Sequence, residues 1–184
     1  MDGTKERQTL SVLVDNEAGV LSQVSRLFSR KGYNIESFAV GPTDNPEISR
    51  MTIDVIADLT QADFLCNQLR KLFPVHSVKI LDPKHSIRRE LVLIKVHAED
   101  STVKSEIIQV ANIFRASVID VSVSSLTLAV IGTEDKASAM EQLLAQHGIM
   151  ELARTGTVAL ERGTFTLDEE TKEKGEFNYG KVVL

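Results

Sequence analysis

A loop between an extended segment and a helical one gathers the groups needed to hold a small anion. The extended segment ends at Asp15-Asn16, and Gly19 supplies a turn. An amphipathic helix then begins at Val20. The first backbone N–H groups of a helix have no acceptor within the helix and carry the positive end of its dipole. A carboxylate fits such a space, although a glycine in this position is also common as a plain turn residue.

An α-amino acid requires acceptors for its ammonium group, donors for its carboxylate and an apolar surface for its side chain. This sequence offers all three kinds of group around the loop. Asn16 places a side-chain amide at its rim. Asn34 begins a later strand, at a point where pairing of two sheets would bring it near the first loop of a neighbouring copy. The pattern therefore favours amino-acid binding.

Residues for independent catalysis are missing from the sequence. The single cysteine, Cys66, lies in a helical pattern and is interpreted as a buried apolar residue rather than a reactive thiol. There is no nucleophile-elbow sequence, phosphate-binding loop or dinucleotide fingerprint, and no nucleophile–base pair for a small hydrolase. The four histidines have spacings that match no metal site; they are His76, His85, His97 and His147. We expect no bound metal, no cofactor and no enzyme activity.

Charge and hydropathy narrow the class of partner. The 184-residue chain has a net charge of −5 and a pI near 5.4, so nothing favours nucleic acid or an anionic membrane. No apolar run approaches the roughly 20 residues that a membrane helix requires, and the first residues lack the apolar core of a signal peptide. We expect a cytoplasmic protein with a protein partner.

Hydrophobic periodicity predicts how the loop is positioned. Strand-type alternation over residues 9–16 is followed by a helical stripe from Val20 to Phe28, which Gly32 can terminate in a left-handed conformation. Thr60 is a plausible N-cap for a second helix. The apolar side of this helix is predicted to include Phe64, Leu65, Leu69, Leu72 and Phe73. Further strands are predicted at residues 33–40, 48–57 and 75–81. The order is βαββαβ.

The same order of elements is predicted again after a short polar segment, residues 82–86. Helices are expected at residues 102–115 and 135–146, and strands at 90–98, 117–123, 126–132 and 149–160. The fold class is therefore α+β, with two tandem ferredoxin-like βαββαβ domains at residues 8–82 and 87–163. Residues 164–184 form a charged tail, interpreted as mobile, with ordering on a partner as the alternative.

Two sequence motifs resemble a known family. Asp15 to Leu21 resembles the first strand–loop–helix of ACT domains, which are small amino-acid-binding modules. The run from Val40 to Ile53, preceded by Leu27 to Ser37, is similar to the regulatory small subunits of acetolactate synthase, also called acetohydroxyacid synthase. The resemblance continues through Ile113-Phe114-Arg115-Ala116 and Arg154-Thr155-Gly156 and spans roughly residues 9–163.

The resemblance implies an effector pocket shared by two copies. One copy supplies the loop and helix start, and the other supplies the beginning of the second strand. In the family a proline often precedes the loop glycine, and Ala18 stands in its place here. The implied effector-binding residues are Asn16, Ala18, Gly19, Val20 and Leu21 from one copy, with Asn34 and Ile35 from the other.

The resemblance also implies what the protein does. It would be a non-catalytic homodimer that binds the catalytic (large) subunit, raises its activity, and confers feedback inhibition by a branched-chain amino acid, with valine the first candidate. The partner would carry thiamine diphosphate, Mg and FAD and would condense two pyruvates, or pyruvate with 2-oxobutyrate, in valine, leucine and isoleucine biosynthesis. The alternative is a tandem-ACT amino-acid sensor acting on a transcriptional partner, although no basic or helix-turn-helix segment is present.

The connection from Gly41 to Arg50 has two interpretations. It can simply join two strands, or Gly41, Pro42 and Arg50 can contact the partner. Arg50 on a strand edge could clamp a carboxylate of the catalytic subunit or pair within the dimer. For other charged residues in the motifs a structural salt bridge is the default; these are Arg89, Glu90, Arg115, Asp120 and Arg154.

Overall fold

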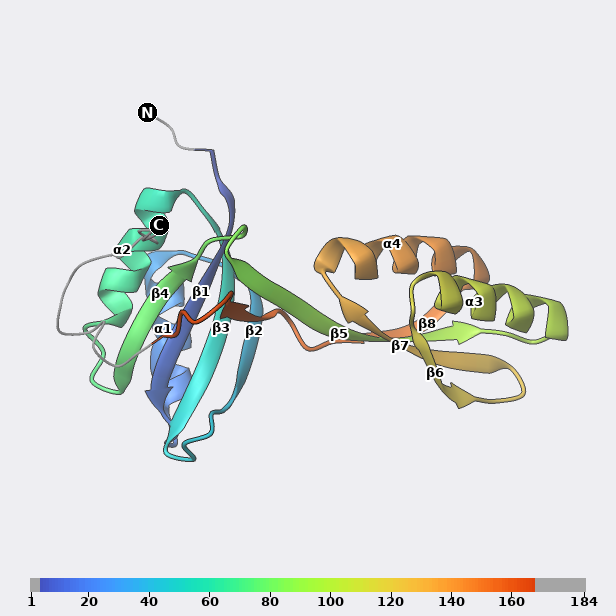
Figure 1. The fold of residues 1–184 in the computed structure, drawn as a ribbon, viewed down its shortest axis with the longest axis horizontal. Helices are drawn as coiled ribbons and strands as arrows, with labels where there is room; N and C mark the ends of the chain where they lie inside the picture. Colours follow the sequence, from blue (N-terminus) through green and yellow to red (C-terminus); the bar gives the residue numbers. More distant parts are fainter. Residues whose placement is uncertain (1–3, 168–184) are drawn as a thin grey trace. The chain divides into compact units, whose positions relative to one another are not determined.

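The computed structural model describes residues 4–167. The described residues divide into two compact units, one formed by residues 4–87 with 159–167 and the other by residues 88–158. Each unit contains a β-sheet and two helices, drawn in Figure 1. The predicted α+β class with two ferredoxin-like folds is confirmed.

The first unit has the predicted βαββαβ order. Its sheet is antiparallel, with strands in the order β2-β3-β1-β4, so β2 lies at one edge and β4 at the other. The elements are β1 (Glu6–Asp15), α1 (Val20–Lys31), β2 (Ile35–Pro42), β3 (Ile48–Ala57), α2 (Leu59–Leu69) and β4 (Val75–Leu81).

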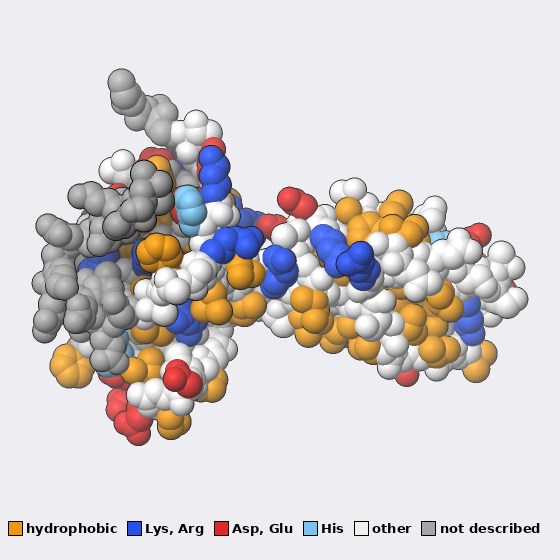
Figure 2. All heavy atoms as spheres, viewed as in Figure 1, with side chains coloured by type: hydrophobic (Ala, Val, Ile, Leu, Met, Phe, Trp, Pro, Cys, Tyr) orange, Lys and Arg blue, Asp and Glu red, His pale blue; other side chains and the backbone are white. Residues whose placement is uncertain are grey.

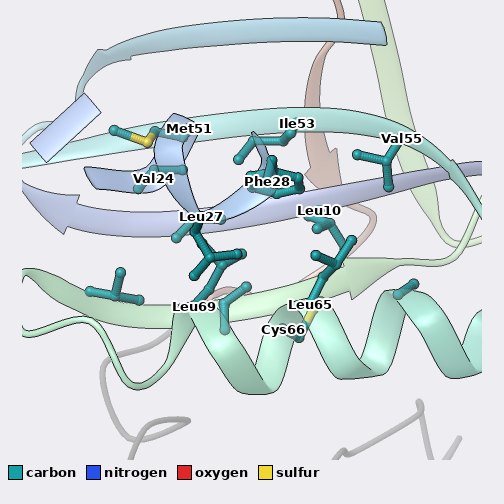
Figure 3. Close-up of a cluster of buried hydrophobic side chains, with 14 of the residues drawn as sticks. Leu10, Val24, Leu27, Phe28, Met51, Ile53, Val55, Leu65, Cys66 and Leu69 are labelled. Atoms are coloured by element: carbon teal, nitrogen blue, oxygen red, sulfur yellow. The ribbon is translucent and has the colours of Figure 1, made fainter. Parts of the chain in front are cut away.

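One face of this sheet carries the hydrophobic core. Leu10, Val12 and Val14 alternate along β1 and are completely buried, as a strand with one covered face requires. Phe28 from α1 and Leu65 from α2 pack into the same cluster, shown in Figure 3. The predicted apolar side of α2 is confirmed for Leu65 and Leu69, which are fully buried. It is wrong for Phe64 and Phe73, which are 41% and 92% exposed.

The ends of the two helices are set by different devices. Gly32 ends α1 with a φ of 74°, which confirms the predicted left-handed stop. The predicted N-cap at Thr60 is wrong. Asp58 caps α2 instead, because its side chain accepts from the Gln61 N–H while the Gln61 side chain accepts from the Asp58 N–H.

The second unit repeats the order, and its sheet runs β6-β7-β5-β8 with β9 also paired to β5. The prediction of a single strand over residues 149–160 is wrong. The strand is interrupted between Arg154 and Val158, where Gly156 has a φ of 77°. The elements are β5 (Ser86–His97), α3 (Ser101–Ile113), β6 (Ser117–Val121), β7 (Ser125–Gly132), α4 (Glu134–Leu144), the 3-10 helix η1 (Ala145–His147), β8 (Ile149–Arg154) and β9 (Val158–Glu161).

The edge strand β6 of the second unit exposes apolar side chains. All five of its residues are exposed, including Ile119 at 53% and Val121 at 65%. Val123, just beyond the strand, is 88% exposed. Hydrophobic side chains are visible over the surface of this unit in Figure 2. An exposed edge with such side chains is typical of a surface that pairs with another chain.

Residues 159–167 belong to the first unit. The Glu161 carboxylate pairs with Lys79 of β4 at 2.7 Å, and the Arg162 N–H donates to the His85 carbonyl at 2.8 Å. In Figure 1 this segment crosses the sheet on the side opposite α1. The sequence places the boundary of the second domain at residue 163, whereas the contacts place the return to the first unit at 159. Of the predicted tail, residues 168–184 lie outside the described residues.

Other expectations from sequence are confirmed locally. Cys66 is fully buried. Arg154 forms ion pairs with Glu90 at 2.8 Å and with Glu141, which confirms the structural salt bridge expected for Arg154 and Glu90. No helix in the described part of the chain is both long and apolar enough to cross a membrane.

Candidate functional site

The loop between β1 and α1 leaves backbone donors at the start of the helix. Gly19 is the N-cap of α1, with φ 89° and ψ −14°, and no side chain caps the helix there. The Gly19 carbonyl accepts the first helical bond, from the Gln23 N–H at 3.0 Å. Helix geometry gives the N–H groups of Leu21 and Ser22 no acceptor within α1, so they are available to an anion in front of the helix.

Asn16 holds this loop against the connection between β2 and β3. Its side-chain amide donates to the Pro46 carbonyl at 2.8 Å, and its side-chain oxygen accepts from the Ser49 hydroxyl at 2.9 Å. Its backbone N–H donates to the Glu47 carbonyl at 2.7 Å. Both ends of the Asn16 amide are thus engaged, and Asn16 positions the loop. These partners lie at least 30 positions away in sequence, and no local pattern indicates them.

The other loop residues divide between anchoring and exposed positions. Val20 is 4% exposed and packs in the core, so it fixes the start of α1 and can offer a ligand only its backbone. Ala18 is exposed, and Leu21 is 47% exposed. Leu21 therefore presents apolar surface next to the free helix donors, as a branched aliphatic ligand requires.

Asn34 and Ile35 lie at the opposite end of α1 from Gly19. The helix has 12 residues, which span about 18 Å at 1.5 Å per residue. The Asn34 amide donates to the Glu36 carboxylate at 2.8 Å, and Ile35 is partly buried against the core. A single chain therefore does not bring the two halves of the predicted site together.

The sheet register fixes where these two halves lie. Asp15 pairs with Ile48, and Pro42 pairs with Ser49. The Gly19 loop thus follows β1 at the end of the sheet where β2 finishes, while Asn34 precedes the start of β2 at the other end. Because β2 is an edge strand, its outer side is open to a second strand.

The position of Arg50 differs from the prediction. Its strand, β3, lies between β2 and β1 and is not an edge. The Arg50 guanidinium extends along the sheet face and donates to the Ser11 hydroxyl at 3.0 Å. Gly41 and Pro42, by contrast, do lie on the edge strand β2, with Pro42 exposed.

No metal centre is formed within the described residues, since His, Cys, Asp and Glu side chains nowhere gather in threes with suitable geometry. Burial raises the pKa of the Cys66 thiol to about 12, so this group is not a nucleophile at neutral pH. The candidate site is thus a set of backbone donors and apolar side chains, which is suited to binding rather than to reaction.

Comparison with known proteins agrees with this description. Residues 10–77 match a family model described as an AHAS small subunit-like ACT domain. Residues 89–163 match a model described as the small subunit of acetolactate synthase. Both units of the chain are therefore covered by models of the same kind of protein.

Individual relatives extend the match along most of the chain. A probable acetolactate synthase small subunit from Methanothermobacter thermautotrophicus is 44% identical over 158 residues, 86% of this chain and 94% of that protein. The acetolactate synthase small subunit of Aquifex aeolicus is 42% identical over 170 residues, 92% and 88% of the two chains. The crystal structure of the small subunit from Thermotoga maritima superposes with a TM-score of 0.81 at 37% identity, covering 87% of this chain and 99% of that one.

Proposed function

This chain belongs to the family of acetolactate synthase small subunits, and we propose that it regulates a catalytic acetolactate synthase subunit in response to a branched-chain amino acid. In this proposal the chain binds the catalytic subunit, raises its activity, and lowers it again when valine binds. The chain itself carries out no chemistry. Thiamine diphosphate, Mg and FAD would reside on the partner, in the biosynthesis of valine, leucine and isoleucine.

The observation that carries the proposal is the uncapped N-terminus of α1. Gly19 has a left-handed φ of 89° and carries no side chain, and no side chain among the described residues caps the helix start with a hydrogen bond. The N–H groups there are donors for the carboxylate of an amino acid, and exposed Leu21 is an apolar neighbour for its side chain. The described residues supply no comparable glycine N-cap in the second unit, where Asp100 and Thr133 occupy the N-cap positions.

A homodimer would complete the pocket. If two β2 edges pair antiparallel about a twofold axis, the start of one β2 lies beside the end of the other. Asn34 of the second copy then approaches the Gly19 loop of the first, at the end of the sheet where that loop lies. Each dimer would hold two equivalent pockets built from Asn16, Ala18, Gly19, Val20 and Leu21 of one copy and from Asn34 and Ile35 of the other.

Regulation requires that valine binds one arrangement of the dimer better than another. The catalytic partner would be activated only by the unliganded arrangement. A typical coupling free energy of about 1–3 kcal/mol would give about 5- to 150-fold modulation of activity. A pocket that spans two copies suits this role, because any change in the pairing of the copies changes the distance between its two halves.

Two exposed surfaces are candidates for contact with the catalytic subunit. One is the apolar edge strand β6, with Ile119 and Val121 exposed. The other is the β2–β3 connection, to which Gly41 and Pro42 lead and which Asn16 ties to the effector loop. Through the Asn16 bonds, movement of the effector loop would be transmitted to this connection.

The test is reconstitution with the catalytic subunit from the same organism. The two proteins are mixed, and acetolactate formation is measured with valine, leucine or isoleucine present or absent. We expect association, a rise in activity on adding this chain, and inhibition by valine. A chain that binds valine but neither associates with the catalytic subunit nor changes its rate would refute the proposal and favour a sensor acting on a transcriptional partner.

A further inference from the structure

A cavity lies within the first unit, and none of the loop residues around Gly19 lines it. It has a volume of about 230 Å³ and lies where the returning chain meets the sheet face opposite the helices. Two charged side chains, Arg50 and Glu161, line it, and the rest of its wall is mainly apolar. The other lining residues are Leu81, Leu160, Gly163, Phe165, Thr166 and Leu167.

Arg50 supplies an incompletely paired cation to this cavity. Among the described residues, its guanidinium makes a single side-chain hydrogen bond, to the neutral Ser11 hydroxyl at 3.0 Å. Burial lowers the pKa of Arg50, and the opposite charge of Glu161 raises it by a smaller amount. A guanidinium has five N–H donors arranged to grip a carboxylate with two of them. Arg50 therefore has donors left for an anionic group.

Glu161 supplies an acceptor that lacks a donor. Its Oε1 atom pairs with Lys79 at 2.7 Å. Its Oε2 atom is buried and has no hydrogen-bond partner in the described part of the chain. Burial of a carboxylate oxygen without a donor is costly, and each such atom in a folded protein requires an explanation. A ligand ammonium group would satisfy it.

Apolar residues of the cavity provide a surface for the aliphatic side chain of a ligand. Leu81 and Leu167 are 2% and 7% exposed and form a buried floor, whereas Leu160 and Phe165 remain 55% and 60% exposed. A ligand with an aliphatic side chain would cover these two exposed side chains. A cavity of about 150 Å³ is known to hold benzene, so 230 Å³ has room for an amino acid with a branched side chain.

From these contacts we infer a second site on each chain, which binds a zwitterionic aliphatic α-amino acid with its carboxylate on Arg50, its ammonium on Glu161 and its side chain against Leu160 and Phe165. All of these residues belong to one chain and one unit, so this outer-face site needs no second copy. The pocket proposed at Gly19, by contrast, needs residues from two copies. The inference of the outer-face site holds whether or not the proposal for Gly19 is right.

Calorimetric titration of the full-length protein with L-valine, L-leucine and L-isoleucine tests the inference. We expect two equivalents per chain for the wild type with the preferred amino acid, and one equivalent for Gly19→Asp, which retains the outer-face site. Arg50→Met should weaken the remaining equivalent about 10- to 100-fold, as expected for loss of hydrogen bonds between charged groups. Glu161→Gln should weaken it in the same way.

Matched controls separate binding from folding. Arg162→Met removes an exposed arginine next to Glu161 that does not line the cavity, and it should leave both equivalents intact. Arg50→Lys keeps the charge and should recover part of the affinity. L-Valinamide lacks the carboxylate and 3-methylbutanoate lacks the ammonium group, so neither should bind at the outer face.

The outcomes distinguish the two sites. If Gly19→Asp abolishes all binding while folded Arg50→Met and Glu161→Gln titrate like the wild type, the outer-face site does not exist. If one equivalent survives Gly19→Asp and disappears with Arg50→Met, the outer-face site is established. If Gly19→Asp has no effect and all binding depends on Arg50 and Glu161, the outer-face site stands and the pocket at Gly19 is refuted.

Discussion

Gly19 shows how a single backbone conformation can decide the chemistry of a helix end. A Cβ added at this position would meet nothing within 4 Å, so open space alone would admit a larger residue. The constraint is the φ of 89°, which side-chain-bearing residues adopt only at a cost of about 1–2 kcal/mol. A substitution here therefore combines moderate strain with whatever the new side chain places over the helix donors.

The first prediction separates these two effects at Gly19. Gly19→Asp places a carboxylate over the helix start, where it occupies the donors and repels the effector carboxylate. We expect loss of valine inhibition with activation of the catalytic subunit retained, measured as acetolactate formation against valine concentration. Gly19→Ala carries the same strain without the charge and should stay inhibitable at higher valine concentration. Equal inhibition of Gly19→Asp and wild type would exclude the loop as the effector site.

The second prediction concerns the thiol of Cys66. Its pKa in the folded state is raised to about 12 by burial, whereas an unfolded cysteine ionises at about 8.5. The unfolded state therefore releases the proton first, and the free energy of unfolding falls as pH rises between these two values. We expect Cys66→Ala to flatten this part of the stability curve in chemical denaturation. A thiol reagent should label wild-type protein at neutral pH only as fast as it unfolds; rapid labelling of folded protein would contradict this.

At the scale of elements, the N-cap of α2 offers a direct stability test. Asp58 and Gln61 cap each other's backbone N–H groups. Asp58→Ala should lower the free energy of unfolding by about 0.5–2 kcal/mol, whereas Asp58→Asn, which keeps the acceptor, should lose less. Urea denaturation measures both variants, and Thr60→Ala serves as the control for the cap that sequence alone favours. A larger loss for Thr60→Ala than for Asp58→Ala would contradict the observed cap.

The elements that sequence predicts well are those with local signals. The sequence pattern predicts β3 with the bounds that the structure shows, Ile48–Ala57, and Gly32 marks the end of α1. Failures arise where the deciding partner is distant or where two local signals compete. Thr60 and Asp58 both suit an N-cap, and only the reciprocal bond to Gln61 distinguishes them. The pairing of Lys79 with Glu161 joins residues 82 positions apart, so the returning chain and its cavity have no local signature.

The same distinction between local and distant signals applies to the candidate site. The Gly19 loop and the helix start follow from local pattern, and the structure places both as expected. The role of Asn16 was not predictable, because its partners Pro46 and Ser49 come from another connection. The periodicity of one strand does not reveal the strand order in a sheet, so the sequence does not predict that β3, which carries Arg50, lies inside the sheet.

For the whole molecule, the return of residues 159–167 makes the first unit discontinuous in sequence. We therefore expect a fragment ending at Ile87 to be less stable than a variant in which a short glycine-serine linker joins Ile87 to Ala159. The linked variant retains the Lys79–Glu161 pair and should dimerise and bind valine without activating the catalytic subunit, because it lacks the second unit. Thermal melts, light scattering and activity assays would measure this. Full activation by the linked variant would remove the role proposed for β6.

Mixed dimers show whether valine is sensed in a pocket shared by two copies. Valine binding is measured by calorimetry for Gly19→Asp homodimers, Asn34→His homodimers, and purified heterodimers of the two. In the heterodimer both substitutions fall on one pocket, which leaves the other with wild-type Gly19 and Asn34. We expect the heterodimer to regain half of the wild-type loop pockets, one per dimer, although neither homodimer has a working one. Heterodimers that recover no such binding would contradict a shared pocket.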